Sequence, residues 1–240
     1  MHTFLKKNLP VPESAKTIHN SIVKSLKRLL ELDVPSPLHP DFKYTFEKML
    51  NRFHQYQGEV IRNYGKRVSC TKGCTHCCHH WVEDVYSFEA EIIVDYIQNH
   101  FPERIDTIVK TCRENEKELV RLNDIMEQKL TENKGEKEIS EIDTTDLLLA
   151  CFYQLERPCA LLSDKGLCTI YNIRPLTCRI YISFSDPGHC SPERINSSDI
   201  PTYLLDLEES ASKLLDTLHE KYNRYNKSGL QALLVDYLQE

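Results

Sequence analysis

Eight of the ten cysteines in the 240-residue chain fall into two groups whose residue type and spacing suit metal binding. The first group is Cys70, Cys74, Cys77 and Cys78, and the second is Cys159, Cys168, Cys178 and Cys190. A turn can bring thiolates two or three residues apart toward one point, as in zinc and iron–sulfur sites. We therefore predict that these eight thiols are metal ligands. The softness of thiolate suits zinc and iron–sulfur clusters about equally.

Cys77 and Cys78 are adjacent, which limits how the eight thiols can be shared. Neighbouring side chains point to opposite faces of a strand and diverge on a helix. They are therefore not expected to converge on one tetrahedral ion. This predicts either two metal centres, or one centre with a reactive thiol left over. Gly73 provides the backbone freedom that a tight turn in this segment requires.

The other two thiols, Cys112 and Cys151, fall on the apolar faces of expected helices. Free cysteine behaves there as a small hydrophobe, so both are predicted to lie in the core. Disulfides are disfavoured because the first residues carry no apolar secretory stretch, which predicts a reducing compartment. The predicted localisation is cytoplasmic.

Basic and aromatic side chains surround the two cysteine groups. Four arginines flank them, namely Arg67, Arg157, Arg174 and Arg179. Guanidinium groups there could offset the negative charge of a thiolate site, although solvated surface positions are the usual alternative for arginine. Cys178 follows Pro175 near an expected helix start, where backbone amides would favour a thiolate. Four histidines, His76, His79, His80 and His189, are expected around the site or at the surface, and Trp81 and Tyr86 in packing.

The composition excludes several classes of protein. A net charge of -6 and a pI near 5.9 argue against nucleic-acid binding, which needs a basic excess. No apolar run approaches the length of about 20 residues that a membrane-spanning helix requires. With seven glycines and no GxGxxG segment, the chain lacks a nucleotide-binding loop. We predict no nucleic-acid and no membrane partner, while a protein substrate or partner stays open.

The spacing of Cys70, Cys74 and Cys77 also matches the C-x3-C-x2-C pattern of radical enzymes that cleave S-adenosylmethionine. Those enzymes use a barrel of alternating strands and helices. This chain lacks that alternation, so the short match is not supported by its context.

Apolar residues recur three and four apart through most of the chain, which predicts a mainly α fold. Helices are expected over residues 14–32, 42–65, 87–97, 102–126, 143–155, 204–218 and 229–237. In the helix over 143–155, the residues predicted to point inward are Leu147, Leu148, Cys151 and Leu155. Residues 131–140 are charged and contain Gly135, which indicates a loop.

Residues 160–162 and 167–171 flank the sequence Ser-Asp-Lys-Gly, which predicts a small β-hairpin beside the cysteines. The fold expected is a single helical domain with this hairpin next to a cysteine-rich metal site. We divide the chain into N-terminal helices (1–65), the cysteine-cluster region (66–195) and C-terminal helices (196–240), which together form one compact unit.

The cysteine segments resemble a known family. The motif residues are Cys70-x3-Cys74-x2-Cys77-Cys78, Cys159-Ala-Leu-Leu, Gly166-Leu-Cys168-Thr-Ile-Tyr171, Arg174-Pro175-x2-Cys178-Arg179 and Cys190. They are similar in order and type to the YkgJ-type cysteine-cluster family, regarded as zinc- or iron-chelating proteins with eight characteristic cysteines. The resemblance covers about Cys70–Cys190, and one branch of it resembles the flagellin lysine N-methylases.

The resemblance adds concrete functional alternatives to the metal site. The leading hypothesis is an iron–sulfur cluster, [4Fe–4S], held by some of the eight thiols. The alternatives are a zinc-binding structural or metal-handling protein, and a protein methylase that uses the cluster and S-adenosylmethionine. In the methylase, Arg174 or Arg179 would hold the carboxylate of the cofactor.

Overall fold

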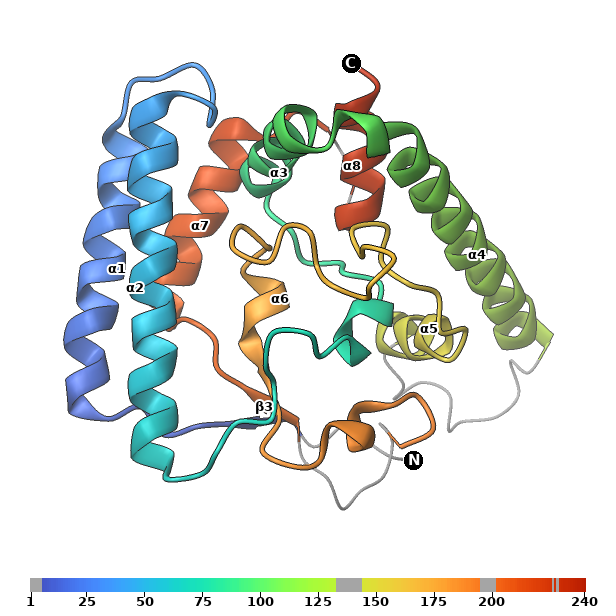
Figure 1. Ribbon diagram of the computed structural model, residues 1–240, viewed down its shortest axis with the longest axis horizontal. Coiled ribbons are helices and arrows are strands. Elements are labelled where there is room, and N and C mark those ends of the chain that lie inside the picture. Colours follow the sequence, from blue (N-terminus) through green and yellow to red (C-terminus); the bar gives the residue numbers. More distant parts are fainter. Residues whose placement is uncertain (1–5, 133–143, 195–201, 226, 228) are drawn as a thin grey trace.

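The computed structural model of the chain describes residues 6–132, 144–194, 202–225, 227 and 229–240 (Figure 1). Its helices are α1 (Glu13–Glu31), α2 (Pro40–Tyr64), α3 (Ser87–His100), α4 (Ile105–Glu132), α5 (Thr144–Tyr153), α6 (Thr177–Ile180), α7 (Glu209–Tyr222) and α8 (Leu230–Leu238). Short 3-10 helices are η1 (His76–His79), η2 (Pro102–Arg104) and η4 (Pro187–Cys190). The mainly α prediction is confirmed. Most of the loop predicted over 131–140 lies outside the described residues.

The long helices α1 and α2 lie side by side at one edge of the molecule, with α7 against them (Figure 1). α2 begins at Pro40, two residues before the predicted start, because proline needs no N–H bond in a first helical turn. It ends at Gly65, whose φ of 73° few other residues adopt. Fully buried side chains of this bundle include Ile22, Leu26, Leu29, Phe42, Met49, Phe53 and Tyr56.

A second apolar cluster forms where α3, α4 and α8 meet. It contains Ile93 and Ile97 from α3, Ile108 and Cys112 from α4, and Leu233 and Leu234 from α8. Cys112 is completely buried, which confirms its predicted place in the core. Cys159 and Cys168 pack against the same cluster, so one cysteine segment rests directly on the helical core.

The structure contains a three-stranded sheet that the sequence analysis did not predict. β3 (Thr202–Leu204) lies in the middle, parallel to β1 (Lys6–Asn8) and antiparallel to β2 (Tyr181–Ile182). The predicted hairpin over 160–171 is present as one antiparallel bridge between Leu162 and Cys168. Because β2 directly follows α6, the sheet fixes the end of the segment that carries Cys178.

Helix α5 corrects one prediction. Leu147 and Leu155 are each 38% exposed and Cys151 is exposed, whereas Phe152 and Tyr153 are fully buried. The prediction that Cys151 lies in the core is therefore wrong. The sequence of this helix is apolar on nearly every side, so periodicity could not identify the buried one.

No helix among the described residues combines the length and apolarity that crossing a lipid bilayer requires. The division at residues 65 and 195 stays a prediction.

Gly229 holds the segment after η1 against the start of α8. Its N–H donates to the Glu83 carbonyl, and the next N–H, of Leu230, donates to Val82. Gly229 has a φ of 90°, and a Cβ there would lie 2.7 Å from the indole nitrogen of Trp81. We expect Gly229→Ala to lower the free energy of unfolding by about 2 kcal/mol or more, through strain and overpacking.

Urea unfolding of Gly229→Ala and Gly58→Ala measures this effect against a matched control. Gly58 lies within α2 with no atom near its Cβ position, so alanine there should stabilise by about 0.5–1 kcal/mol. Equal effects of the two substitutions would contradict the close contact at Trp81.

Candidate metal centre

The first cysteine segment is a chain of tight turns that ends in η1. Gly73 has a φ of 99°, and the Cys74 N–H bonds the Thr71 carbonyl at 3.0 Å. The Cys78 N–H bonds the Thr75 carbonyl at 2.8 Å, which begins the 3-10 turn. These turns keep the four cysteines of the segment near one another, as their spacing predicts.

Polar side chains within three helices anchor the second cysteine segment. Asn115 of α4 donates to the Pro158 carbonyl at 3.1 Å, just before Cys159. Glu89 of α3 accepts the Leu176 N–H at 2.9 Å, just before Cys178. Gln57 of α2 donates to the Arg179 carbonyl at 2.9 Å. The helical core therefore fixes this segment just before Cys159 and around Cys178.

Sequence reasoning missed these three anchors. Each is a buried polar residue on a helix. Gln57 lies four residues after Phe53, and Asn115 three after Cys112, so both fall on an apolar stripe. A polar residue on such a stripe needs a buried hydrogen-bond partner. The position of these residues in the sequence could therefore have indicated that they hold another segment in place.

Cys70, Cys74 and Cys190 form what we call the outer set. The Ser183 N–H donates to the Cys70 sulfur at 3.2 Å, and the Ser183 hydroxyl lies near enough to Cys190 to offset part of the rise that burial causes in the pKa of that thiol. Cys74 lies near enough to both for its charge to act on them. Ser69 pairs with Ser183 through two bonds of 2.9 Å, so the two cysteine segments join at this point.

Cys159, Cys168 and Cys178 form what we call the inner set. Cys159 and Cys168 lie on the two sides of the bridged turn, and each sulfur accepts the N–H of the residue two positions later, Leu161 and Ile170. Cys178 of α6 lies close to both. The Cys159 N–H also donates to the Cys78 carbonyl at 2.8 Å, which joins this set to the end of the first segment.

Cys77 and Cys78 lie at the junction of the two sets. Their thiols form a hydrogen bond with one another, so they do not point apart as expected for adjacent residues. The reason is the tight 3-10 turn of η1, in which they are consecutive. Cys77 lies near the thiols of both sets, since its charge acts on Cys70 and Cys190 as well as on Cys159, Cys168 and Cys178.

The donor set fits a thiolate-bound metal. Among the described residues, no three His, Cys, Asp or Glu side chains already meet in metal-ion geometry. The sulfurs nevertheless receive, at Cys70, Cys159 and Cys168, the N–H bonds that stabilise thiolate ligands. Zinc or an iron–sulfur cluster would be held by these thiols and would supply, respectively, a structural link or an electron-transfer group.

Burial raises the pKa of the inner thiols. It raises the pKa of Cys159 to about 11 and that of Cys178 well above its usual range, where neighbouring thiols add to the effect. The expectation that a helix start favours the Cys178 thiolate is therefore wrong, because α6 has four residues and the thiol is desolvated. Metal binding at neutral pH would accordingly displace protons from these thiols.

The four arginines predicted near the sulfurs differ in position. Arg67 is exposed, and Arg157 bonds Asn115 at 2.6 Å and lies 4.0 Å from Glu114. Arg179 donates to the carbonyls of Asn172 and Arg174 and so closes the loop before α6.

Of the four arginines, Arg174 best fits the predicted role of offsetting the negative charge of the thiolates. Its charge acts on Cys77, Cys168 and Cys178. The guanidinium stacks 4.0 Å from the ring centre of Tyr171, and its Nε is buried and has no hydrogen-bond partner among the described residues. Arg174 is therefore the arginine that faces the thiols with a free donor.

Tyr153, with the His80 ring stacked on it, lies against Cys190 of the outer set. The His80 ring stacks on Tyr153 at 3.7 Å, and Tyr153 donates to the Cys190 carbonyl. Burial lowers the pKa of His80 to about 4, so this ring is neutral at physiological pH. Trp81 packs on Phe152 and Tyr86 on Phe88, which confirms their packing role. Sequence reasoning had not connected Tyr153 with the site.

The buried carboxyl of Glu89, which holds the residues before Cys178, makes the stability of the protein depend on pH. Burial raises the pKa of this carboxyl to about 7, from 4.5. Between about pH 4.5 and pH 7, the folded protein therefore keeps the proton of the Glu89 carboxyl, whereas the unfolded chain has lost it. Its contribution to stability is complete below about pH 4.5 and is lost as the pH rises through about 7, by at most about 3 kcal/mol.

Glu89→Gln is expected to remove this part of the pH dependence, because glutamine does not ionise. Urea unfolding at about pH 5 and about pH 8 measures the difference between the variant and the wild type. Taking this difference cancels the contributions of His19 and His80, which titrate in both proteins. The same loss of stability in both proteins would contradict the raised pKa.

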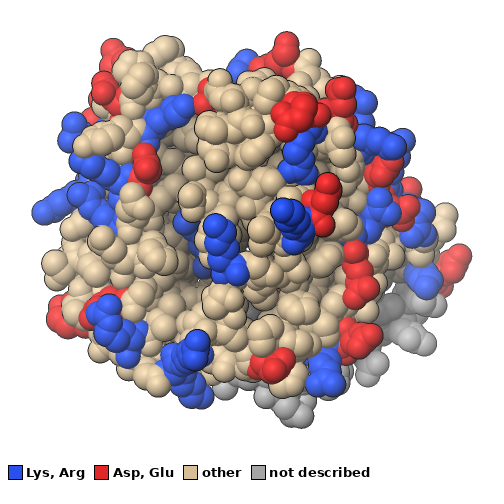
Figure 2. Space-filling view, in the orientation of Figure 1, with Lys and Arg blue, Asp and Glu red and all other residues tan. Residues whose placement is uncertain are grey.

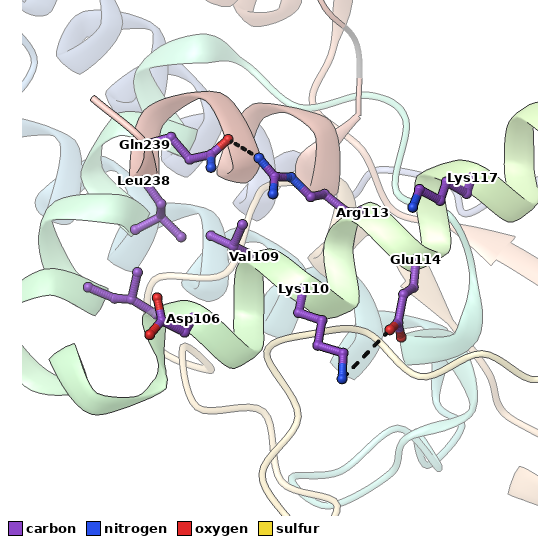
Figure 3. A pocket seen from close by; sticks show the side chains of 9 residues that line it. Asp106, Val109, Lys110, Arg113, Glu114, Lys117, Leu238 and Gln239 are labelled. Carbon is purple, nitrogen blue, oxygen red and sulfur yellow. Dashed lines mark hydrogen bonds and ion pairs between the residues drawn. The ribbon is translucent and has the colours of Figure 1, made fainter.

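The face that carries the short cysteine-bearing elements is hollowed at its middle, with Lys and Arg side chains beside the hollow (Figure 2). A separate pocket of about 480 Å³ lies between α4 and the end of α8 (Figure 3). Its lining contains none of the cysteines, and two pairs of side chains within it interact, Arg113 with Gln239 and Lys110 with Glu114. The pocket is therefore distinct from the thiol site.

The comparisons with known proteins agree with this assignment of the site. The model of the family CxxCxxCC, described as "Putative zinc- or iron-chelating domain", matches residues 69–199. No curated protein and no solved structure gives a significant match. The matched range is more than half of the chain and contains both cysteine groups, in keeping with the resemblance to the YkgJ-type family. The chain therefore belongs to the CxxCxxCC family of zinc- or iron-chelating domains.

Proposed function

We propose that the protein binds an iron–sulfur cluster, [4Fe–4S], through thiols of Cys70, Cys74, Cys77, Cys78, Cys159, Cys168, Cys178 and Cys190. The observation that carries the proposal is the meeting of two distant cysteine segments, joined by the 2.8 Å bond from the Cys159 N–H to the Cys78 carbonyl, by Ser69 with Ser183, and by the N–H bond from Ser183 to the Cys70 sulfur. Hydrogen bonds to sulfur, like the last of these, are one of the means by which proteins tune iron–sulfur clusters. The ten cysteines are free thiols, and the cytoplasm is the compartment that keeps them so.

Anaerobic purification tests the proposal directly. Iron, sulfide and zinc contents are measured, and visible absorption and electron paramagnetic resonance spectra are recorded before and after reduction. A coloured protein with iron and sulfide in equal amounts, and a resonance that depends on reduction, is the expected result. Colourless protein with stoichiometric zinc and no iron would overturn it in favour of a zinc-binding structural or metal-handling protein.

A protein methylase that uses S-adenosylmethionine is the second candidate, and Arg174 favours it. A buried guanidinium donor without a partner beside the thiols is suited to a carboxylate. Arg179 is less suited to this role, because two of its nitrogens already bond backbone carbonyls. Calorimetry of the reduced holoprotein with S-adenosylmethionine tests this candidate. Binding of S-adenosylmethionine that Arg174→Lys weakens, in samples matched to the wild type in metal content, is the expected result, and absence of binding would remove the candidate.

A further inference from the structure

The two sets of thiols lie in different surroundings. Cys159 and Cys168 of the inner set pack against the apolar cluster of α3, α4 and α8. In the outer set, Cys70 is exposed, and its sulfur accepts the N–H of a polar residue, Ser183. Cys159 and Cys168 therefore rest on the core, whereas Cys70 of the outer set reaches solvent.

Different connections also join members of each set. The Ser183 N–H donates to the Cys70 sulfur, and the Ser183 carbonyl accepts two bonds from Ser69, next to Cys70. The inner set is joined by the bridge between Leu162 and Cys168, which is supported by the bond of 3.0 Å from the Thr169 N–H to Leu161. These connections do not overlap.

Cys77 and Cys78 are the contact between the sets. The exposed Cys77 lies near thiols of both, and the Cys78 carbonyl accepts the Cys159 N–H at 2.8 Å. A tetrahedral metal site requires four donors, and each set provides three. The adjacent pair can therefore complete both.

We propose that the protein holds two metal centres, an outer one with Cys70, Cys74 and Cys190 and an inner one with Cys159, Cys168 and Cys178, each completed by one thiol of the Cys77–Cys78 pair. This inference rests on the proposed function in that the thiols bind metal, but it does not require that the metal is iron. The inner centre links the cysteine segments to the core. The outer centre is open to solvent and exchanges its metal.

Zinc alone is the probe for the number of centres. The full-length apoprotein, prepared under reducing conditions, is titrated with zinc, and the bound metal is measured after gel filtration. The wild type is expected to bind about two equivalents. Cys74→Ser and Cys190→Ser are each expected to retain about one, and so is the double variant, because both residues serve the same centre. The double variant that combines Cys74→Ser with the inner substitution Cys168→Ser is expected to bind neither equivalent of zinc.

Chelator competition separates the two centres in time. Zinc release from the wild type should have a fast and a slow phase of equal amplitude, and Cys74→Ser should lose the fast phase alone. Cys151→Ser is the matched control, since Cys151 is an exposed cysteine outside both sets. It should retain both equivalents and both phases.

The inference is overturned if the wild type binds one equivalent, or if Cys74→Ser or Cys190→Ser loses all zinc. Neither outcome depends on the inner variant, which could lose its fold. Failure of the iron–sulfur proposal is recognised separately, by the absence of iron and sulfide from the anaerobic protein. If iron and sulfide are absent but the protein binds two equivalents of zinc, the inference of two centres still holds.

Discussion

Removing the metal is expected to unfold residues 66–86 and 157–190 while the bundle of α1, α2 and α7 stays folded. Regular elements in these two segments, η1, α6, β2 and η4, have four residues or fewer. They bury little apolar surface of their own, and short helices are marginal without tertiary support. Binding of a metal to thiols supplies folding free energy of about 10–16 kcal/mol in small zinc domains.

A loss of about 5 kcal/mol would lower the melting temperature of a chain of this size by about 10–20 °C. Hydrogen exchange followed by mass spectrometry, with and without a chelator under reducing conditions, locates the change. Protection should be lost in the two cysteine segments and kept in α1 and α2, whose core is fully buried. Uniform loss across the chain, or none in the cysteine segments, would contradict this expectation.

Arg174→Gln is expected to weaken metal binding by about 10–100-fold, which is the usual effect of removing a group next to metal ligands. The Arg174 charge acts on three thiols, and tetrathiolate centres carry net negative charge that a guanidinium offsets. Competition with a chromophoric zinc chelator at fixed pH measures the dissociation constant.

Two further variants test the cause of this effect. Arg174→Lys keeps the positive charge but loses the planar stacking on Tyr171, so it should lie between the wild type and Arg174→Gln. Arg67→Gln is the matched control, because Arg67 is an exposed arginine close to the cysteines in sequence. Equal losses in Arg67→Gln and Arg174→Gln would show that only overall charge matters.

The long helices could be predicted from the sequence because their apolar stripes are unambiguous. Ile22, Leu26 and Leu29 recur at helical spacing in α1 and are all fully buried. The buried side of α5 could not be predicted in this way, because leucines lie around most of that helix and tertiary packing selected Phe152 and Tyr153. The sheet was missed because its strands have two or three residues, too few for a period to register.

For the metal site, too, the features that depend on local sequence could be predicted, and those that depend on long-range contacts could not. Local spacing and residue type sufficed to select the eight cysteines, and the family match covers both of their groups. Their grouping depends on Ser183, which belongs to no motif and reaches Cys70 only through the folded chain. Likewise, the hydrogen bond between Cys77 and Cys78 depends on the 3-10 turn, which adjacency alone does not predict.

The positions of the thiols along the chain also set an order of events during synthesis. Every donor of the inner centre, from Cys77 or Cys78 to Cys178, is synthesised before Cys190 of the outer set, which follows Cys70 by 120 residues. Loop closure over such a span costs chain entropy before any bond to metal repays it. The first metal should therefore enter at the inner thiols, and the second should arrive only after Ser183 has joined the two segments. The outer centre would then be a late marker of completed folding.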